Sequence, residues 1–407
     1  MKRIKILRII ARLNIGGPAI HVILLTHGLD KIRFDSLLIS GPTDKHEGDM
    51  SYYAQDKNVK PIVITELKRE LNFLDDILAF IKIYRIINKE KPDIIHTHTA
   101  KAGTLGRLAG ILYNLFNFIK GKRIKFIHTF HGHVFEGYFG SFKTRLFILI
   151  ERFLALFTDR ILTVSETLKK ELVSLGICPC NKIEVIPLGF ELDIFFKILP
   201  RNVTSLNIGI IGRLVPIKNH RLFLEAAKLF IQSGHQEKFK FKIIGDGELR
   251  SELEEYSRRL NISDFVEFLG WQKDLISVYS SLDIVALTSI NEGTPVSLIE
   301  AMASGKVVVA TDVGGVKDLL GEDSDSDVID KSKEGFRVLK RGIIVRPQDS
   351  ASFAAALNFI LHNNALMREM GMRGRDFAKI KFTKERLIRD LEDLYVSLLN
   401  SSFKRPL

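Results

Sequence analysis

The sequence predicts an α/β protein with two Rossmann-like domains, whose parallel sheets face each other across a cleft. A chain of 407 residues is long enough for two domains of ordinary size. Short apolar segments that favour strands alternate with segments of helical periodicity, a pattern typical of doubly wound parallel sheets. The pattern also starts twice, because residues 207–213 (NIGIIGR) repeat the character of residues 5–12 (KILRIIAR).

The expected strands form two series. The first series consists of residues 5–10, 36–39, 61–64, 93–96, 125–128, 160–164 and 183–186, and the second of residues 207–211, 240–244, 266–269, 284–287 and 307–310. The segment between the two series lacks clean periodicity, which favours a linker. We therefore predict a first domain over residues 1–190, a linker over residues 191–205 and a second domain over residues 206–380. Residues 381–407 contain an amphipathic helix that can fold back onto the first domain.

The composition narrows the class of protein. The chain is 46% hydrophobic and 27% charged, which is typical of a globular protein and not of a disordered one. Cys178 and Cys180 have no second Cys or Cys/His pair nearby, so we expect reduced thiols in a cytoplasmic protein. Charges interrupt the N-terminal segment, and no run of about 18 apolar residues exists, so we expect neither a signal peptide nor a membrane-spanning helix.

The positive charge is concentrated in the first half. Of the net charge of +12, residues 1–200 carry +10, from 30 Lys and Arg against 20 Asp and Glu. Residues 101–150 alone hold eight basic residues and one acidic residue, Glu136. Such asymmetry indicates an anionic partner, for which nucleic acid and an anionic membrane are both open, or a basic surface that serves solubility only.

Residues 292–300 (EGTPVSLIE) are the most informative segment. They follow a predicted buried strand, and Thr294 as cap with Pro295 at the first position predicts a helix start, with Gly305 as the stop. Glu292 then lies on the loop and Glu300 about two turns into the helix. Amide groups at a helix start favour a diphosphate, and two carboxylates can accept hydrogen bonds from sugar hydroxyls. Taken by itself, this spacing of two glutamates is equally typical of an amphipathic helix whose charges face the solvent.

Three further turns between a strand and a helix contain residues that could bind a ligand. Gly16 and Gly17, before a proline, allow close approach of a phosphate to bare backbone, although an ordinary turn has the same pattern. Arg213 lies at the end of the first strand of the second series, and Lys218 lies at the start of the next helix. Both cations could bind a diphosphate. The alternative is that each is only a surface charge.

Gly245 and Gly247 surround an aspartate after another strand and predict a sharp structural turn that also lines the ligand pocket.

Two motifs in the sequence are candidates for metal binding, but their signal is weaker. Residues 323–327 (DSDSD) contain the D-x-D pattern, but no strand leads into it, so a solvated loop is expected. Histidines cluster in residues 96–98 (HTH) and 128–133 (HTFHGH) without an evident Cys or carboxylate companion, so lining of the cleft is favoured over metal binding.

Taken in order, these motifs resemble the retaining glycosyltransferases of family 4 (group 1 type), which have the GT-B fold. The resemblance runs from about residue 4 to about residue 380 and rests on GGP near the N-terminus, HTHTAKAG, HTFHGHVF, GRL-x-x-x-K, GDG and E-x-seven-E. It implies transfer of a sugar from a nucleotide-sugar, most often a UDP-sugar, to an acceptor hydroxyl with retention of configuration. The nucleotide-sugar is a substrate, and the resemblance implies no metal or other cofactor.

The resemblance also implies roles for individual residues. Arg213 and Lys218 would neutralise the departing diphosphate, and Glu300 would hold the ribose hydroxyls. Glu292 and the amides of Gly293 and Thr294 would line the site of the transferred sugar. The histidine that matches the family's active-site position is His131, and the two glycines that would approach the phosphates from the first domain are Gly16 and Gly17.

No carboxylate nucleophile is evident. We therefore take as a working hypothesis that the departing phosphate oxygen accepts the proton of the acceptor hydroxyl on the same face, with fixed positive charge stabilising departure. Lys317 and Asp318 stand where the family commonly has Pro-Glu, so a shorter carboxylate would serve or the contact is lost.

Acceptors in this family are often lipid-linked sugars at the inner membrane face, for surface polysaccharide, lipopolysaccharide or glycolipid assembly. Residues 111–126 and 138–157 mix aromatic and basic side chains and could rest on an anionic bilayer, which would make this a peripheral protein. The second segment could equally be a core helix. A nucleotide-sugar epimerase is the rival enzyme, and a basic nucleic-acid-binding protein the rival of another class; the latter lacks a reading module, so no nucleic acid is expected.

Overall fold

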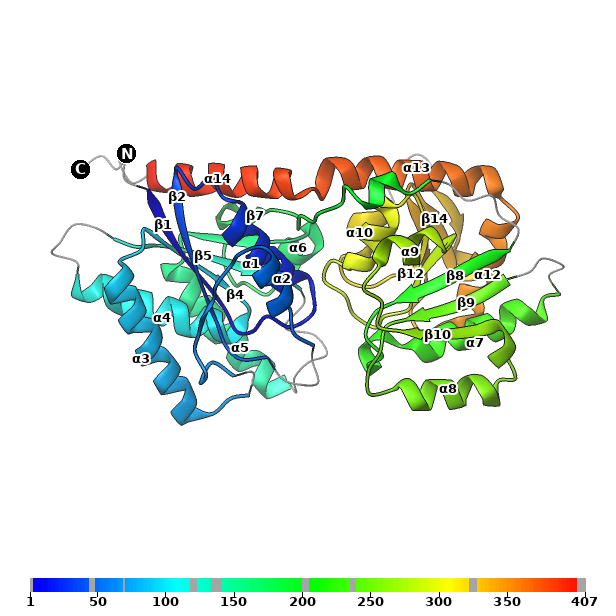
Figure 1. The fold of residues 1–407 in the computed structure, drawn as a ribbon, viewed down its shortest axis with the longest axis horizontal. Helices are drawn as coiled ribbons and strands as arrows, with labels where there is room; N and C mark the ends of the chain where they lie inside the picture. The colour runs from blue at the N-terminus through cyan, green and yellow to red at the C-terminus, as the bar shows by residue number, and fades with distance from the viewer. Residues whose placement is uncertain are drawn as a thin grey trace. The chain divides into compact units, whose positions relative to one another are not determined.

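The computed structural model describes residues 3–43, 48–68, 70–117, 123–132, 141–199, 205–234, 239–321 and 328–400. The chain forms two compact units (Figure 1). The first consists of Met1–Phe190 together with Lys384–Leu407, and the second of Glu191–Thr383. Both units are α/β and are built on one sheet each.

The sheet of the first unit has the order β3-β2-β1-β4-β5-β6-β7, and all of its strand pairs are parallel. Its strands are β1 Ile4–Ile10, β2 Phe34–Ser40, β3 Ile62–Val63, β4 Ile94–His98, β5 Lys125–Phe130, β6 Arg160–Thr163 and β7 Ile183–Val185. Its helices are α1 Gly17–Gly28, α2 Ser51–Asp56, α3 Phe73–Glu90, α4 Ala100–Phe116, α5 Ser141–Phe157, α6 Glu166–Ser174 and α14 Lys384–Asn400, with a 3-10 turn at Cys180–Lys182.

Alternate residues of β1 serve two cores because successive strand side chains point to opposite faces. Leu7 and Ile9 belong to a core that includes residues of α3 and α4. Ile6 belongs to a core on the other face, which includes Leu391 and Tyr395 of α14 (Figure 1). The last helix therefore supplies part of the core of the first unit.

The sheet of the second unit has the order β10-β9-β8-β11-β12-β15-β14-β13. Its strands are β8 Leu206–Ile211, β9 Phe239–Ile244, β10 Val266–Gly270, β11 Ile284–Leu287, β12 Val307–Thr311, β13 Ile329–Lys331, β14 Phe336–Leu339 and β15 Gly342–Val345. Its helices are α7 His220–Gln232, α8 Arg250–Arg259, α9 Leu275–Ser280, α10 Val296–Ala303, α11 Val316–Leu320, α12 Ser350–Leu361 and α13 Asn364–Lys381, with 3-10 turns at Phe195–Lys197, Pro216–Lys218, Ser263–Phe265 and Ser332–Glu334.

Two features of this unit differ from the sequence prediction. The strands β13, β14 and β15 were not expected, and they pair antiparallel with one another, so the sheet is parallel only from β10 to β15. Residues 191–199 were expected to be linker, but Leu192, Phe195 and Ile198 are buried. The ring of Phe195 packs edge-on against Tyr279, which attaches this segment to the second unit.

Candidate active site

Three loops meet at the carboxyl edge of the second sheet. They follow the neighbouring strands β8, β11 and β12, and parallel strands place such loops on one edge, where ligands bind in this class of fold. The bonds that join the loops are Thr288 Oγ1 to the carbonyl of Lys218 (3.0 Å), Thr311 Oγ1 to the carbonyl of Ser289 (2.7 Å) and Gly315 N–H to the carbonyl of Gly293 (3.1 Å). These hydrogen bonds fix the loops relative to one another and thereby position the side chains that the loops carry.

Lys218 and Glu292 form an ion pair across two of these loops. Lys218 Nζ lies 2.5 Å from Glu292 Oε1, and Ser289 Oγ donates to the same oxygen at 2.6 Å. Among the described residues, Glu292 Oε2 has no hydrogen-bond donor, so it can accept a bond from a ligand. Arg213 is half-buried and makes no side-chain hydrogen bond or ion pair within the described part of the chain. The loops thus present one unpaired and one tethered cation.

The helix after Glu292 begins one residue later than predicted. Pro295 is the N-cap of α10, and no side chain caps the helix. The predicted cap, Thr294, instead has a buried hydroxyl without a hydrogen-bond partner. Buried hydroxyls are usually bonded, so this one and the uncapped amides beside it are available to a ligand. Because α10 starts at Val296, Glu300 lies just over one turn into the helix, and not two turns as expected.

Glu300 is paired with a tyrosine from another helix. Tyr279 of α9 donates its hydroxyl to Glu300 Oε2 at 2.8 Å. Burial raises the pKa of Glu300 to about 7, although the bond from Tyr279 opposes this rise. Burial and the nearby Glu300 also raise the pKa of Tyr279 well above its ordinary value. Near neutral pH the carboxyl of Glu300 is therefore divided between its protonated and ionised forms.

Gly245 and Gly247 have a packing reason to be glycine. A Cβ on Gly247 would lie 2.6 Å from the carbonyl oxygen of Leu214, and one on Gly245, where φ is 132°, would overlap the carbonyl of Gly212. The two loops are bonded backbone to backbone, with Leu214 N–H donating to the carbonyl of Asp246 at 2.9 Å. The glycines therefore allow the loop after β9 to lie directly against the loop that carries Arg213.

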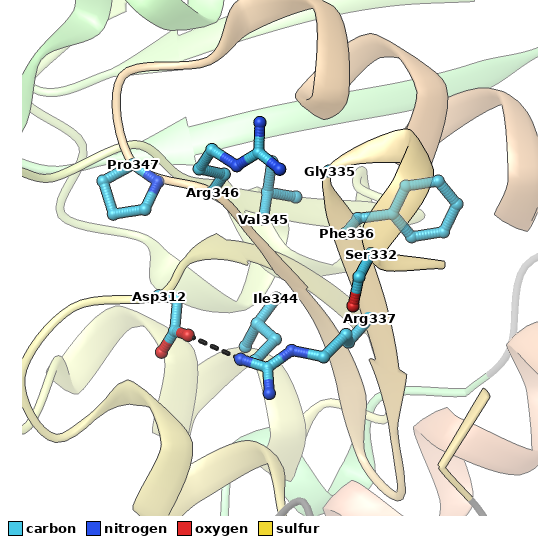
Figure 2. A pocket seen from close by; sticks show the side chains of 9 residues that line it. All are labelled: Asp312, Ser332, Gly335, Phe336, Arg337, Ile344, Val345, Arg346 and Pro347. Carbon is cyan, nitrogen blue, oxygen red and sulfur yellow. Dashed lines mark hydrogen bonds and ion pairs between the residues drawn. The ribbon is translucent and has the colours of Figure 1, made fainter. Parts of the chain in front are cut away.

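A small cavity of about 260 Å³ is lined by residues of β14 and β15, by residues near these strands, and by Asp312 after β12 (Figure 2). Asp312 faces Arg337 across it, with Arg337 Nη2 donating to Asp312 Oδ2 at 2.8 Å (Figure 2). Lys317 Nζ lies 3.4 Å from the same oxygen. Asp318, at the position where the family commonly has Glu, lies in α11 and does not line this cavity. None of the predicted site residues lines it either, so it is a separate feature of this edge.

In the first unit, Gly16 and Gly17 form the start of α1. Gly16 is the N-cap with φ of 155°, a conformation that residues with side chains rarely adopt, and Gly17 is the first helical residue. No side chain caps this helix, and its first turn has no acidic residue. The backbone conformation thus requires glycine at position 16, and the helix start has the electrostatic character that favours a phosphate.

His131 directly follows β5 and belongs to a buried histidine cluster. Its Nε2 lies 3.0 Å from Nδ1 of His98, at the end of β4, and its ring centre lies 5.0 Å from that of His21 in α1. Burial lowers the pKa of His131 to about 3 and the pKa values of His21 and His98 well below their ordinary range. At neutral pH these imidazoles are therefore uncharged.

The other predicted histidines do not line a surface. His96 is fully buried, and its two ring nitrogens bond to the hydroxyls of Tyr395 and Thr129, both at 2.7 Å. His128 is also buried and bonds through Nδ1 to Thr97 Oγ1 at 2.8 Å. The cleft-lining interpretation is wrong for these two residues, because they lie inside β4 and β5 where both faces of the sheet are covered. His133 and residues 323–327 lie outside the described residues.

Sequence reasoning missed two members of these groups. Tyr279 comes 21 positions before Glu300, in a different helix, and no local spacing connects them. His21 lies in the apolar helix α1, outside the two histidine motifs of the sequence, where a core position is the ordinary interpretation. The signal for His21 lies only in the topology, since α1 follows β1 and β1 pairs with β4, which carries His98.

Comparison with known families covers nearly the whole chain. Residues 15–194 match the family model "Glycosyltransferase Family 4", and residues 193–377 match "Glycosyl transferases group 1". The chain is 27% identical over 366 residues to the Escherichia coli UDP-Gal:alpha-D-GlcNAc-diphosphoundecaprenol alpha-1,3-galactosyltransferase, covering 87% of this chain and 88% of the relative. It is 26% identical to the capsular polysaccharide biosynthesis glycosyltransferase CapM of Staphylococcus aureus, covering 83% and 86%.

Solved structures agree in fold. The structure of Anabaena HepE in complex with UDP superposes with a TM-score of 0.75 at 18% identity, covering 97% of this chain and all of the other. These matches favour glycosyl transfer over the rival epimerase. With both halves matched in order, the chain belongs to the family 4, group 1 glycosyltransferases and has the GT-B fold.

Proposed function

We propose that this enzyme transfers a sugar from a UDP-sugar, with retention of configuration, to a saccharide or lipid-linked acceptor in the assembly of a surface polysaccharide or glycolipid. The E. coli relative is named for a UDP-galactose donor and a diphosphoundecaprenol-linked acceptor, and the structure of HepE is a complex with UDP. The observation that carries the proposal is the bonded set of loops around Lys218, Glu292 and Arg213.

Arg213 and Lys218 are proposed to bind the donor diphosphate. A half-buried guanidinium without a carboxylate partner among the described residues is suited to bidentate recognition of phosphate. Lys218 is held in place by Glu292 until the anion arrives, and a diphosphate then competes with that carboxylate for the ammonium. Fixed cations at this position stabilise the charge that develops on the leaving group and so lower the barrier to its departure.

Glu292, Gly293 and Thr294 are proposed to contact the transferred sugar. The free Oε2 of Glu292 and the unpartnered hydroxyl of Thr294 are suited to sugar hydroxyls. Glu300 is proposed to accept hydrogen bonds from the ribose hydroxyls, which favours its ionised form. For Gly16, Gly17 and His131 we propose the roles that the family resemblance implies, at the donor phosphates and sugar. Gly245 and Gly247 are proposed to act by placing the loop of Arg213.

The transfer is proposed to need no metal ion, because Arg213 and Lys218 supply the charge that a divalent cation would otherwise supply. His131 is uncharged at neutral pH and so can accept or donate a hydrogen bond without adding charge. The proton of the acceptor hydroxyl is proposed to pass to the departing phosphate oxygen on the same face of the sugar.

The donor site is tested with a thermal-shift panel of UDP, GDP, ADP and their sugar conjugates on the full chain and on Arg213→Ala. We expect only UDP and UDP-sugars to raise the melting temperature, and the variant to lose that rise. The matched control is Arg221→Ala, whose side chain pairs with Glu252 on the exposed surface of the same unit. Loss of the UDP response in the control, or its retention in Arg213→Ala, would contradict the assignment.

A lipid-linked acceptor requires a membrane surface, and α5 offers a candidate for one. No helix among the described residues is long and apolar enough to cross a bilayer. On α5, however, Leu146, Leu149, Phe153 and Leu156 form an exposed stripe at helical spacing. Arg145 and Arg152 are exposed beside it, within a region rich in basic residues. We propose that this stripe lies on the anionic cytoplasmic face of a membrane as a peripheral contact.

Vesicle sedimentation tests this contact. Phosphatidylglycerol vesicles should retain the protein, whereas phosphatidylcholine vesicles should not, and salt should weaken retention. Phe153→Glu should abolish retention, while Ile32→Glu, at an isolated and 84% exposed position of the same unit, should not. Equal retention by both lipids, or by Phe153→Glu, would contradict the membrane proposal without affecting the donor site.

A further inference from the structure

The buried histidine cluster leaves four ring nitrogens without a partner. His21 is 2% exposed, and neither of its nitrogens has a hydrogen-bond partner among the described residues. Nε2 of His98 and Nδ1 of His131 are likewise buried and unpartnered. Buried polar atoms are almost always bonded, so the two unpartnered nitrogens of His21, beside the rings of His98 and His131, lack a partner that a bound ion or water would supply.

The geometry brings the three imidazoles together from three fixed elements. His21 lies on α1, His98 ends β4 and His131 follows β5. One ring nitrogen from each lies within 4.8 Å of the others. Nδ1 of His98 and Nε2 of His131 lie 3.0 Å apart in a hydrogen bond, which an ion bound by both rings would replace. Ligand nitrogens about 2.0–2.1 Å from a tetrahedral zinc lie about 3.3 Å apart, so binding needs a modest contraction around His21.

The chemistry of the trio suits a transition metal. Burial keeps all three imidazoles uncharged, which is the form that binds metal. The neighbouring His96 is excluded as a ligand because both of its nitrogens are bonded to hydroxyls. Arg8, buried nearby and bonded to Tyr395, repels a cation, so only an ion that gains strongly from imidazole ligands should bind.

We propose that His21, His98 and His131 form a binding site for a divalent transition-metal ion such as Zn²⁺. The site goes beyond the proposed transfer, which needs no ion. Three imidazoles leave the fourth position of a tetrahedral ion open to water or another ligand. Because His131 is proposed to act at the donor sugar, an ion held there occupies it, and the expected consequence is inhibition of transfer by zinc.

The test measures metal binding directly. The full chain carrying Cys178→Ser and Cys180→Ser, which removes both thiols of the protein, is stripped of metal and titrated with ZnCl₂. We expect one zinc per chain by elemental analysis and no binding of MgCl₂. His21→Ala and His98→Ala should each weaken zinc binding at least about 10- to 100-fold, the loss that even an outer-shell partner causes. His220→Ala removes a buried histidine with two unpartnered nitrogens in the other unit and should bind zinc normally.

X-ray absorption at the zinc edge identifies the ligands of the bound zinc in the parent protein, which carries only the two cysteine substitutions. This measurement needs no histidine variant, so it does not depend on whether those variants fold. We expect a shell of about three imidazole nitrogens at about 2.0–2.1 Å. Fewer than two imidazoles in that shell, no zinc uptake by the parent, or unchanged affinity in His21→Ala would overturn the proposal. Since UDP binding is measured separately, none of these results bears on the donor site.

Discussion

Replacing Glu300 with glutamine should change the stability of the second unit and its affinity for a nucleotide in opposite directions. Burial raises the pKa of this carboxyl from 4.5 to about 7, so the folded state keeps a proton that the unfolded chain has released. The stability gained from that proton is fully present below about pH 4.5 and is lost as the pH rises through about 7. The difference amounts to at most about 3 kcal/mol.

Urea unfolding followed by tryptophan fluorescence measures this difference, because the single tryptophan, Trp271, lies in the second unit. At pH 8 we expect Glu300→Gln to be more stable than the parent by up to about 3 kcal/mol, and at pH 5 by less than about 1 kcal/mol. Glu255→Gln on the exposed face of α8 is the control and should show no such dependence. A stability gap that is equal at the two pH values would refute the raised pKa.

The same variant should bind UDP more weakly. Glutamine cannot supply the charged acceptor for the ribose hydroxyls, and hydrogen bonds to a charged group contribute about 1.5–3 kcal/mol. Calorimetry at pH 8 should therefore show a loss of about 10- to 100-fold in affinity. A more stable protein with undiminished UDP affinity would remove Glu300 from the nucleotide site while leaving the pKa argument intact.

Three further results are expected. Glu151→Ala removes the carboxylate that lies 2.7 Å from the buried guanidinium of Arg107. The variant should lower the free energy of unfolding by about 3–5 kcal/mol in thermal or urea denaturation. Truncating one partner of an exposed ion pair should lower it by less than about 1 kcal/mol. Gly247→Ala places a methyl group against a backbone carbonyl and should cost about 1–3 kcal/mol, with a UDP affinity that falls in parallel if that loop positions the donor site. Glu292→Gln weakens the hold on Lys218 and should bind UDP at least as tightly as the parent while transferring sugar more slowly in a radiolabelled-donor assay; normal transfer would show that Glu292 does not contact the sugar.

Much of the fold was predictable because parallel strands are short and continuously apolar. The segments around Ile208, Ile284 and Val307 are of this kind, and each forms a strand of the second sheet. The strands β13 to β15 carry a weaker signal. Ile329–Lys331 contains two charged residues in three and is exposed at its start, so only its antiparallel pairing with β14 makes it a strand.

The positions of three candidate site residues were predictable from the alternation of strands and helices, which places them on loops after strands. His131 directly follows β5, Arg213 comes two residues after β8, and Glu292 comes five residues after β11. The partners of those residues were not predictable, because they depend on which strands become neighbours. The contact of Tyr279 with Glu300 and that of His21 with His98 each join segments with no common spacing in the chain.

The return of α14 to the first unit has a consequence for how the chain acquires its structure. Leu387, Leu391 and Tyr395 of α14 complete a core whose members outside this helix run from Ile6 to Ile186, roughly 200 or more positions earlier in the chain. During synthesis, a nascent chain that has emerged only as far as residue 190 lacks this covering and exposes the apolar face of β1. Ribosome-bound intermediates should therefore depend on chaperones until the final helix emerges, whereas the second unit, continuous in sequence, can fold while translation proceeds.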